Sequence, residues 1–264
     1  MSEPQNYRMT VAYDGTDFLG FQSQPARRTV QDTLEHALRK VTQSEIRVAG
    51  AGRTDAGVHA VGLVVSFRSD WRHGSQELER ALNAVLPGDV AVRELERVAE
   101  TFHARFSAVS REYIYRVYES PVRIPHLDRY AWRLQSGLNT DRLHRAGAML
   151  VGEADFRAFG QAADGRSTVR SVYRSEWVRC PRSRWGVDEW EYWIEANGFL
   201  RGMVRRIVGT LVRVGQGLLE PEGIRDIIVA RDPALVGVAA PGSGLYFWRA
   251  RYPGDRNMDS DLTR

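Results

Sequence analysis

The hydrophobic residues in the first 100 positions follow two different periods, and their order restricts the possible folds. Val61, Leu63, Val65 and Phe67 alternate as a half-buried strand requires. Thr29, a suitable helix cap, instead precedes apolar residues at helical spacing, which are Val30, Leu34, Ala37, Leu38 and Val41. The predicted elements are a strand at 7–14, a helix from 29, strands at 46–51 and 61–67, a helix at 78–86 and a strand at 90–95.

The second half of the chain repeats this mixture of strands and helices less regularly. Strands are predicted at 113–118, 169–178, 190–197 and 245–249, and helices at 139–150, 199–214 and 222–230. This order predicts an α+β fold of two ferredoxin-like, RRM-like split βαβ subdomains with mostly antiparallel sheets. We predict an N-terminal subdomain at 1–105, a C-terminal subdomain at 106–252 and a polar, mobile tail at 253–264. RNA-recognition modules share the order, but so do many unrelated domains.

Composition limits the location and chemistry of the protein. Its 264 residues, 43% of them hydrophobic, can form a substantial core, and no stretch approaches the roughly 20 apolar residues of a membrane helix. The polar start lacks the apolar segment of a secretory signal. Cys180 is the only cysteine, so no internal disulfide or cysteine metal cluster can form. These features favour a cytoplasmic protein without a membrane segment or a metal.

The basic residues are almost all arginines, because Lys40 is the only lysine. The formal net charge is +4 and the sequence pI is about 9.4, with a balance of −1 over residues 1–110 and +5 over residues 111–264. Arginine suits RNA because its planar guanidinium binds phosphate oxygens in pairs and stacks on bases. Genome composition or heat adaptation explains arginine enrichment equally well, so the charge alone leaves nucleic-acid binding open.

The most informative segment for chemistry spans residues 49–60, with the sequence AGAGRTDAGVHA. Three glycines within eight positions allow tight turns and close approach of the backbone to a ligand. They surround Arg53, Thr54 and Asp55, and His59 follows. Taken alone, Asp55 is better explained as a residue that caps a connecting turn, which is a frequent role of aspartate.

The segment at 52–59, Gly-Arg-Thr-Asp-Ala-Gly-Val-His, resembles the signature of the tRNA pseudouridine synthase A family. Further segments resemble the family in the same order, from about Tyr7 to Tyr252. They lie at 13–22, 29–35, 82–87, 102–108, 111–115, 155–159, 199–209 and 244–246. The resemblance implies the pseudouridine synthase fold and an isomerase that acts on the anticodon arm of tRNA, at uridines 38, 39 and 40. It also implies a homodimer that binds tRNA without a cofactor.

The resemblance also implies roles for five residues. Asp55 matches the family's catalytic nucleophile, and Arg53 matches a residue thought to help displace the target nucleotide. Tyr113 corresponds to the tyrosine that contacts the uracil. Arg205 matches the basic residue that pairs with the aspartate, and Leu245 matches an apolar residue that lines the pocket. At Arg201 and the following glycine this chain differs from many relatives, which carry histidines there.

The chemistry of the reaction explains these residue types. Pseudouridine forms when the bond from ribose to uracil N1 breaks and the turned base rejoins through C5, so no redox cofactor is required. A carboxylate nucleophile divides this displacement into two steps. In a dry pocket Asp55 would need a buried arginine to stay ionised, and removal of Arg205 would then cost about 3–5 kcal/mol. The target base must leave its stack, and a Tyr113 platform can offset that cost. The phenol of Tyr113 is also a candidate acceptor of the C5 proton.

Other interpretations remain for the same residues. Arg201 and Arg205 would lie on one stripe of the predicted helix, and Arg201 and Arg206 are candidates for phosphate contacts. His59 is better explained by a structural role than as a general base. A non-catalytic RNA-binding module would have no need of the Asp55 loop. A glycoside hydrolase would need a second acid, which Asp14 or Asp17 would have to supply.

Overall fold

The computed structural model describes residues 3–135, 137–162, 166–180 and 183–255, and its first half contains the predicted elements in the predicted order. They are β1 (Gln5–Tyr13), α1 (Val30–Thr42), β2 (Ala49–Gly50), β3 (His59–Ser69), α2 (Ser75–Val85) and β4 (Val90–Arg97). The threonine that precedes α1 caps it as expected, because the Thr29 hydroxyl oxygen accepts a hydrogen bond from the Asp32 amide at 3.2 Å. The strand expected at 46–51 shortens to β2.

The second half adds short elements that the sequence did not predict. Its long elements are β5 (Ser110–Glu119), α4 (Thr140–Ala148), β8 (Val169–Arg179), β9 (Asp188–Ala196), α5 (Met203–Gly215), α6 (Gly223–Ala230) and β10 (Leu245–Arg251). The unpredicted ones are α3 (Pro125–Asp128), β6 (Trp132–Leu134), β7 (Gly152–Asp155) and the 3₁₀ turns η1 (Arg157–Phe159), η2 (Pro233–Leu235) and η3 (Gly242–Gly244). Elements of three or four residues are too short to leave a periodic pattern.

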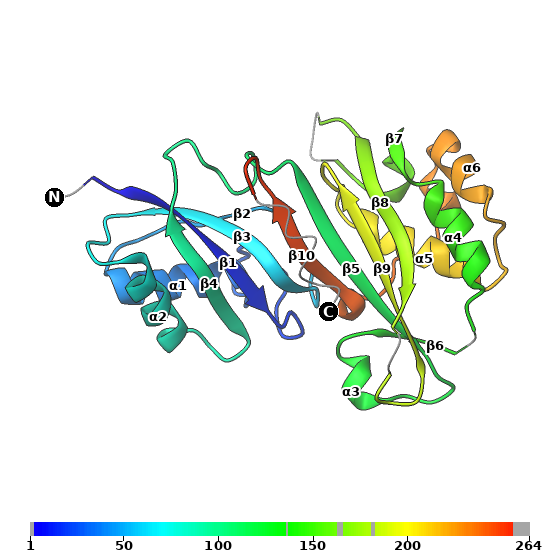
Figure 1. Cartoon of the computed structure of the whole chain (residues 1–264), viewed down its shortest axis with the longest axis horizontal. Coiled ribbons are helices and arrows are strands. Elements are labelled where there is room, and N and C mark those ends of the chain that lie inside the picture. The colour runs from blue at the N-terminus through cyan, green and yellow to red at the C-terminus, as the bar shows by residue number, and fades with distance from the viewer. Residues whose placement is uncertain (1–2, 136, 163–165, 181–182, 256–264) are drawn as a thin grey trace.

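The described strands form one ten-stranded sheet that runs through both halves. Its order is β4-β1-β3-β10-β5-β9-β8-β7, with β2 added to β3 and β6 to β5. β10 is parallel to β3 and antiparallel to β5, so the last strand of the chain joins the two halves (Figure 1). The mostly antiparallel α+β prediction is therefore confirmed. The proposed boundary at residue 105 falls in the segment between β4 and β5.

Each half packs its own helices against the shared sheet. In Figure 1, α1 and α2 lie beside β1, β3 and β4, whereas α4, α5 and α6 lie beside β8 and β9. The two groups of helices lie toward the two ends of the sheet. Residues from both halves can therefore meet at its centre, at β10 and β5. In the described ranges, no helix is long and apolar enough to cross a membrane. Of the predicted tail, residues 256–264 lie outside the described residues.

The helix predicted at 199–214 begins four residues late, and this corrects the placement of Arg201. The backbone of Arg201 pairs with Gln161, and Gly202 has a φ of 72°, which ends the extended segment before α5 starts at Met203. Arg201 is therefore outside the helix and does not share a helical stripe with Arg205. The prediction started too early because Phe199 continues the helical spacing of Met203 and Ile207. The contact with Gln161 instead keeps the backbone at Arg201 in an extended conformation.

Candidate active site

The loop that carries Asp55 connects β2 to β3 and is fastened to the segment after β1. The Phe21 amide donates to the Thr54 carbonyl at 3.1 Å, and the Gly57 amide donates to the Phe18 carbonyl at 3.2 Å. The hydroxyls of Tyr13 and Thr54, both buried, lie 2.7 Å apart in a hydrogen bond. These contacts fix the backbone on both sides of Asp55, so its side chain extends from a rigid loop.

Two glycines allow this close packing. Gly20 has a φ of +93°, and a Cβ there would lie 2.5 Å from the Thr54 carbonyl oxygen. A Cβ on Gly52 would lie 2.8 Å from the Phe247 ring. A larger residue at either position would displace the loop from the sheet. Gly52 is therefore required by the close approach of the Phe247 ring beside the Asp55 loop.

Asp55 forms an ion pair with Arg205, which reaches it from the first turn of α5. The distance from Arg205 Nη1 to Asp55 Oδ2 is 3.2 Å. Arg205 is oriented by a second contact, because its Nε donates to the Ala240 carbonyl at 2.6 Å. The expected pairing is present, but the expected dry, buried pair is not: the Asp55 side chain is 36% exposed and that of Arg205 is 25% exposed. A group that meets a macromolecular substrate must be accessible, and the loop leaves one side of the carboxylate open.

Tyr113 lies on β5 with its ring among other aromatic rings. Its backbone pairs with Phe247 of β10, and its ring packs edge-on against Phe199 and Phe247, with centroids 5.1 and 5.0 Å away. Burial raises the pKa of its phenol well above 10, the Arg111 charge lowers it and the Asp55 charge raises it. The phenol is therefore neutral at physiological pH, within the electrostatic range of Asp55.

Leu245 lies on the same side of the sheet as Tyr113, because Leu245 faces Tyr115 and Phe247 faces Tyr113 in the β10–β5 pair. Leu245 is buried. The Tyr115 hydroxyl donates to the Pro241 carbonyl at 2.8 Å. Burial raises the Tyr115 pKa well above 10, and the Arg205 charge lowers it. Leu245 therefore lies beside Tyr115, whose phenol is near enough to Arg205 for the Arg205 charge to lower its pKa.

Arg53 is exposed and belongs to a group of arginines beside the loop. Burial lowers the pKa of the Arg105 guanidinium, and the charges of Arg53, Arg166 and Arg111 lower it further, so these three arginines lie near Arg105. Arg111 links the group to the loop, since its Nε donates to the Ala51 carbonyl at 3.2 Å. The group forms a positively charged surface next to Asp55.

His59 is buried and performs a packing role. Its Nδ1 accepts a hydrogen bond from the Gly15 amide at 3.0 Å, and its ring stacks on Tyr246 with centroids 4.9 Å apart. Burial lowers its pKa, so the ring is neutral at physiological pH. These contacts support the structural role expected for His59.

Asp14, the candidate second acid, is surrounded by donors. It accepts hydrogen bonds from the Thr16 amide and hydroxyl, from Arg129 and from the Tyr130 hydroxyl. Partial burial raises its pKa, but the Thr16 and Tyr130 hydrogen bonds lower it to about 2. A glycosidase acid has to hold a proton near neutral pH, so Asp14 does not fit that role.

Sequence reasoning did not identify three parts of the site. These are Tyr13, which holds Thr54; Phe199, which packs on Tyr113; and the segment at 240–244. In that segment, the Ala240 carbonyl orients Arg205, and a Cβ on Gly242 would lie 2.5 Å from the Ala56 carbonyl oxygen. The segments around Tyr13 and Phe199 stood out through their resemblance to the family. The contacts of Ala240 and Gly242 left no signal because they depend on the tertiary packing.

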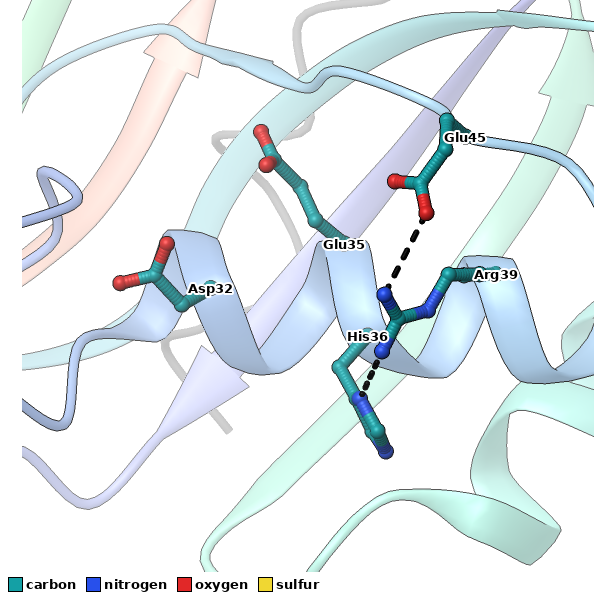
Figure 2. Close-up of a pocket in the computed structure, with 5 residues that line it drawn as sticks. All are labelled: Asp32, Glu35, His36, Arg39 and Glu45. Carbon is teal, nitrogen blue, oxygen red and sulfur yellow. Dashed lines mark hydrogen bonds and ion pairs between the residues drawn. The ribbon is translucent and has the colours of Figure 1, made fainter.

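A pocket on α1 is distinct from these residues. It has an accessible volume of about 220 Å³ and is lined by Asp32, Glu35, His36, Arg39 and Glu45 (Figure 2). Arg39 contacts Glu45 at 3.3 Å and His36 at 3.1 Å, so the Arg39 guanidinium is bonded to two other residues of the pocket lining. The described part of the chain holds no group of three or more His, Cys, Asp or Glu residues that could bind a metal ion.

Comparison with known proteins identifies the family of the chain. The family model described as tRNA pseudouridine synthase matches residues 9–107 and 146–253, which is more than half of the chain. A protein of Thermoanaerobacter sp. named tRNA pseudouridine synthase A is 37% identical over 94% of this chain and 100% of its own length. The protein of that name from Geobacillus kaustophilus is 40% identical over 94% of this chain and 95% of its own.

Likeness to solved structures is weaker. An H/ACA ribonucleoprotein bound to a substrate RNA containing 2'-deoxyuridine is 11% identical, with a TM-score of 0.32, over 78% of this chain and 53% of that one. The family assignment therefore depends on the sequence matches. The residues that the family model matches include the Asp55 loop and α5, and β5 lies between the two matched ranges. On these grounds the chain belongs to the tRNA pseudouridine synthase A family.

Proposed function

We propose that this protein isomerises uridine to pseudouridine in the anticodon stem and loop of tRNA, at positions 38, 39 and 40, with Asp55 as the nucleophile. The observation that carries the proposal is the 3.2 Å contact between Asp55 and Arg205. It joins a loop of the first half to a helix of the second, beside the neutral phenol of Tyr113. The relatives' name, tRNA pseudouridine synthase A, supplies the reaction and the RNA class.

The covalent step begins with the Asp55 carboxylate. Arg205 holds one of its oxygens at 3.2 Å, and the partly exposed side chain leaves the second oxygen for attack. That oxygen attacks either ribose C1′, which releases uracil, or uracil C6. On the first route C5 of the turned base attacks C1′ and the Asp55–C1′ ester bond breaks; on the second the N1–C1′ bond breaks, C5 attacks C1′, and the Asp55–C6 bond breaks as C5 loses its proton. On both routes a C5–C1′ bond replaces the N1–C1′ bond, the Asp55 carboxylate is regenerated, C5 gives up a proton and N1 takes one up.

The surrounding residues have separate tasks in this proposal. Arg53 enters the space that the target nucleotide leaves as it is displaced, and Tyr113 and Leu245 contact the turned uracil. Because the Tyr113 pKa is raised, its phenol donates a hydrogen bond to the base and is a poor acceptor for the C5 proton. This argues against the proton-acceptor role considered from the sequence.

The proposal extends to assembly and location. A homodimer in which one tRNA contacts both subunits would select the site by the shape of the RNA, as recognition of folded RNA often requires. Such an enzyme meets its tRNA in the cytoplasm. Sedimentation of the protein alone and with tRNA tests the dimer, because a monomer at all concentrations that support activity would exclude it.

Release of tritium from tRNA labelled at uridine C5 tests the reaction, since C5 loses its hydrogen only when the new bond forms. The wild-type protein should release tritium, whereas Asp55→Ala should bind tRNA without releasing any. Full activity of Asp55→Ala would exclude the assigned nucleophile. Free uracil among the products would favour a hydrolase, and tRNA binding without turnover by the wild type would favour a binding module.

A further inference from the structure

The segment between β4 and β5 presents one aromatic side chain to solvent. Phe106 is 68% exposed, which is unusual for a phenylalanine, a residue whose burial normally stabilises the folded state. His103 lies against it, with ring centroids 4.4 Å apart at 39°. The guanidinium of Arg105 lies 5.6 Å from the Phe106 centroid. Phe106 is therefore accompanied by two groups that also interact with nucleobases, and most of its side chain stays exposed.

The turn that carries Phe106 is rigid. The Ser107 amide donates to the His103 carbonyl at 2.9 Å, and the His103 amide donates to the Ser107 hydroxyl at 3.0 Å. The buried Ala104 fastens the turn to the core, since its amide donates to Ser66 Oγ at 3.0 Å and its carbonyl accepts from Tyr252 Oη at 2.7 Å. The exposed ring is thus presented in a fixed orientation, which lowers the entropy lost when it binds a ligand.

The ligand that suits this ring carries negative charge. Arg105 repels, and so lies near, Arg53, Arg111 and Arg166. In the described ranges none of these four arginines forms an ion pair with a carboxylate, whereas Arg8 and Arg28 do. The Arg105 guanidinium beside the exposed ring, with Arg53 and Arg166 near it, therefore matches a nucleotide, which combines a flat base with a phosphate.

The surface around Phe106 is continuous with the site of the proposed reaction. Arg111 donates to the carbonyl of Arg105 and to that of Ala51, which precedes the Asp55 loop. The Arg111 charge also lowers the pKa of Tyr113. Arg111 therefore connects the turn that carries Phe106 with the residues that would receive the target uridine.

We propose that Phe106, supported by His103, stacks on an unpaired base next to the target uridine, while the guanidiniums of Arg53, Arg105 and Arg166 contact the adjoining phosphates. The inference builds on the proposed function and assigns the part of the substrate that lies outside the catalytic pocket. Stacking on Phe106 holds the neighbouring base in place when the target base leaves the helix.

Binding of tRNA to Phe106 variants in the full-length protein tests the proposal. The Asp55→Ala background removes turnover, so a dissociation constant can be measured by filter binding. Phe106→Ala should weaken tRNA binding about 10-fold, Phe106→Leu nearly as much, and Phe106→Trp should retain it. Leu218→Ala is the matched control: Leu218 is 67% exposed and follows the far end of α5, roughly 15 Å of helix from Arg205.

Salt dependence separates stacking from charge. Phe106→Ala should leave the slope of log Kd against log salt unchanged, because the ring releases no counterions. Arg105→Gln should lower that slope by about 1. A lower slope in Phe106→Ala would mean that the substitution disturbs the arginines, and it would overturn the stacking role.

A double-mutant cycle identifies the stacked base. Synthetic anticodon-arm hairpins, each with one base removed next to the target, are bound to the wild-type ring and to Phe106→Ala. On one hairpin the 10-fold effect should disappear, because base and ring are then lost together. An unchanged effect on every hairpin, or equal tRNA affinity of Phe106→Ala and its parent, would overturn the inference. Neither result affects tritium release by the wild type, which decides the proposed function separately.

Discussion

Two neighbouring loops of the first half each present a carboxylate to an arginine of the second half. The two carboxylates differ in how many hydrogen-bond donors surround them. Asp14 contacts Arg129 at 2.9 Å, its side chain is 20% exposed, and hydrogen bonds from Thr16 and Tyr130 occupy its oxygens. Asp55 contacts Arg205 at 3.2 Å and is 36% exposed, and within the described residues no other side chain binds it.

The difference separates a carboxylate that stabilises the fold from one that is available for chemistry. An ionised carboxylate offers about four acceptor sites, and donors occupy those of Asp14. Asp55 retains an accessible oxygen on a rigid backbone. Substitutions at the two loops should therefore affect different quantities, with Asp55 acting on rate and Asp14 on the free energy of unfolding.

The largest effect is expected for Asp55→Asn. The amide cannot serve as the nucleophile, so the single-turnover rate of tritium release should fall by at least about 10⁴-fold. The free energy of unfolding should change by less than about 1 kcal/mol, because the ion pair is partly exposed. Urea denaturation measures the second quantity. A rate within 10-fold of the wild type would remove the distinction between the two loops.

Arg205→Ala should have the next largest effect. Loss of the charge beside the proposed nucleophile, Asp55, should lower kcat/KM by about 10²–10³-fold. The cost in stability should be about 1–2 kcal/mol, since the exposed pair contributes little and the hydrogen bond to Ala240 is lost. This is less than the 3–5 kcal/mol expected from the sequence for a buried pair. Arg205→Lys keeps the charge but not the Nε contact, and it should recover part of the rate.

Asp14→Asn should have the opposite effect, with a larger change in the free energy of unfolding than in the rate. Its Arg129, Thr16 and Tyr130 contacts weaken, so the free energy of unfolding should fall by about 1–3 kcal/mol, while the rate per folded molecule stays within about 10-fold. Because the folded pKa is about 2, below the unfolded value of about 3.9, the stabilisation is present above pH 4 and is lost as the pH falls toward 2. Urea denaturation at pH 7 and at lower pH should show the two proteins converging.

The sequence predicted the long elements because their hydrophobic periods are long enough to detect. It also singled out the Asp55 loop, because glycines around charged residues mark close backbone packing. The state of Asp55 was less predictable: its pairing with Arg205 was expected, but its exposure depends on how the loop and the segment at 240–244 fit together. Asp14 was considered only as a second acid, because its donors at Arg129 and Tyr130 are 115 and 116 residues away in the sequence.

The smallest expected effect concerns His59, which packs beside the Asp14 loop. Burial lowers its pKa, the Asp14 charge raises it and the Arg129 charge lowers it, and the ring also contacts Tyr130 and Tyr246. The folded pKa lies below the ordinary value of about 6.5, so its stabilisation is complete above pH 6.5 and is lost as the pH falls below it.

His59→Gln keeps an acceptor for the Gly15 amide and removes the titration. The slope of unfolding free energy against pH should therefore flatten as the pH falls below about 6.5, by at most about 1.4 kcal/mol per pH unit. Urea denaturation across this range measures it, and the rate of tritium release at pH 7.5 should be nearly unchanged. An equally steep slope in the variant would assign the pH dependence to other groups. A large loss of rate would show that the packing around Asp14 and His59 controls the geometry of the Asp55 loop, and would end the separation between the two regions.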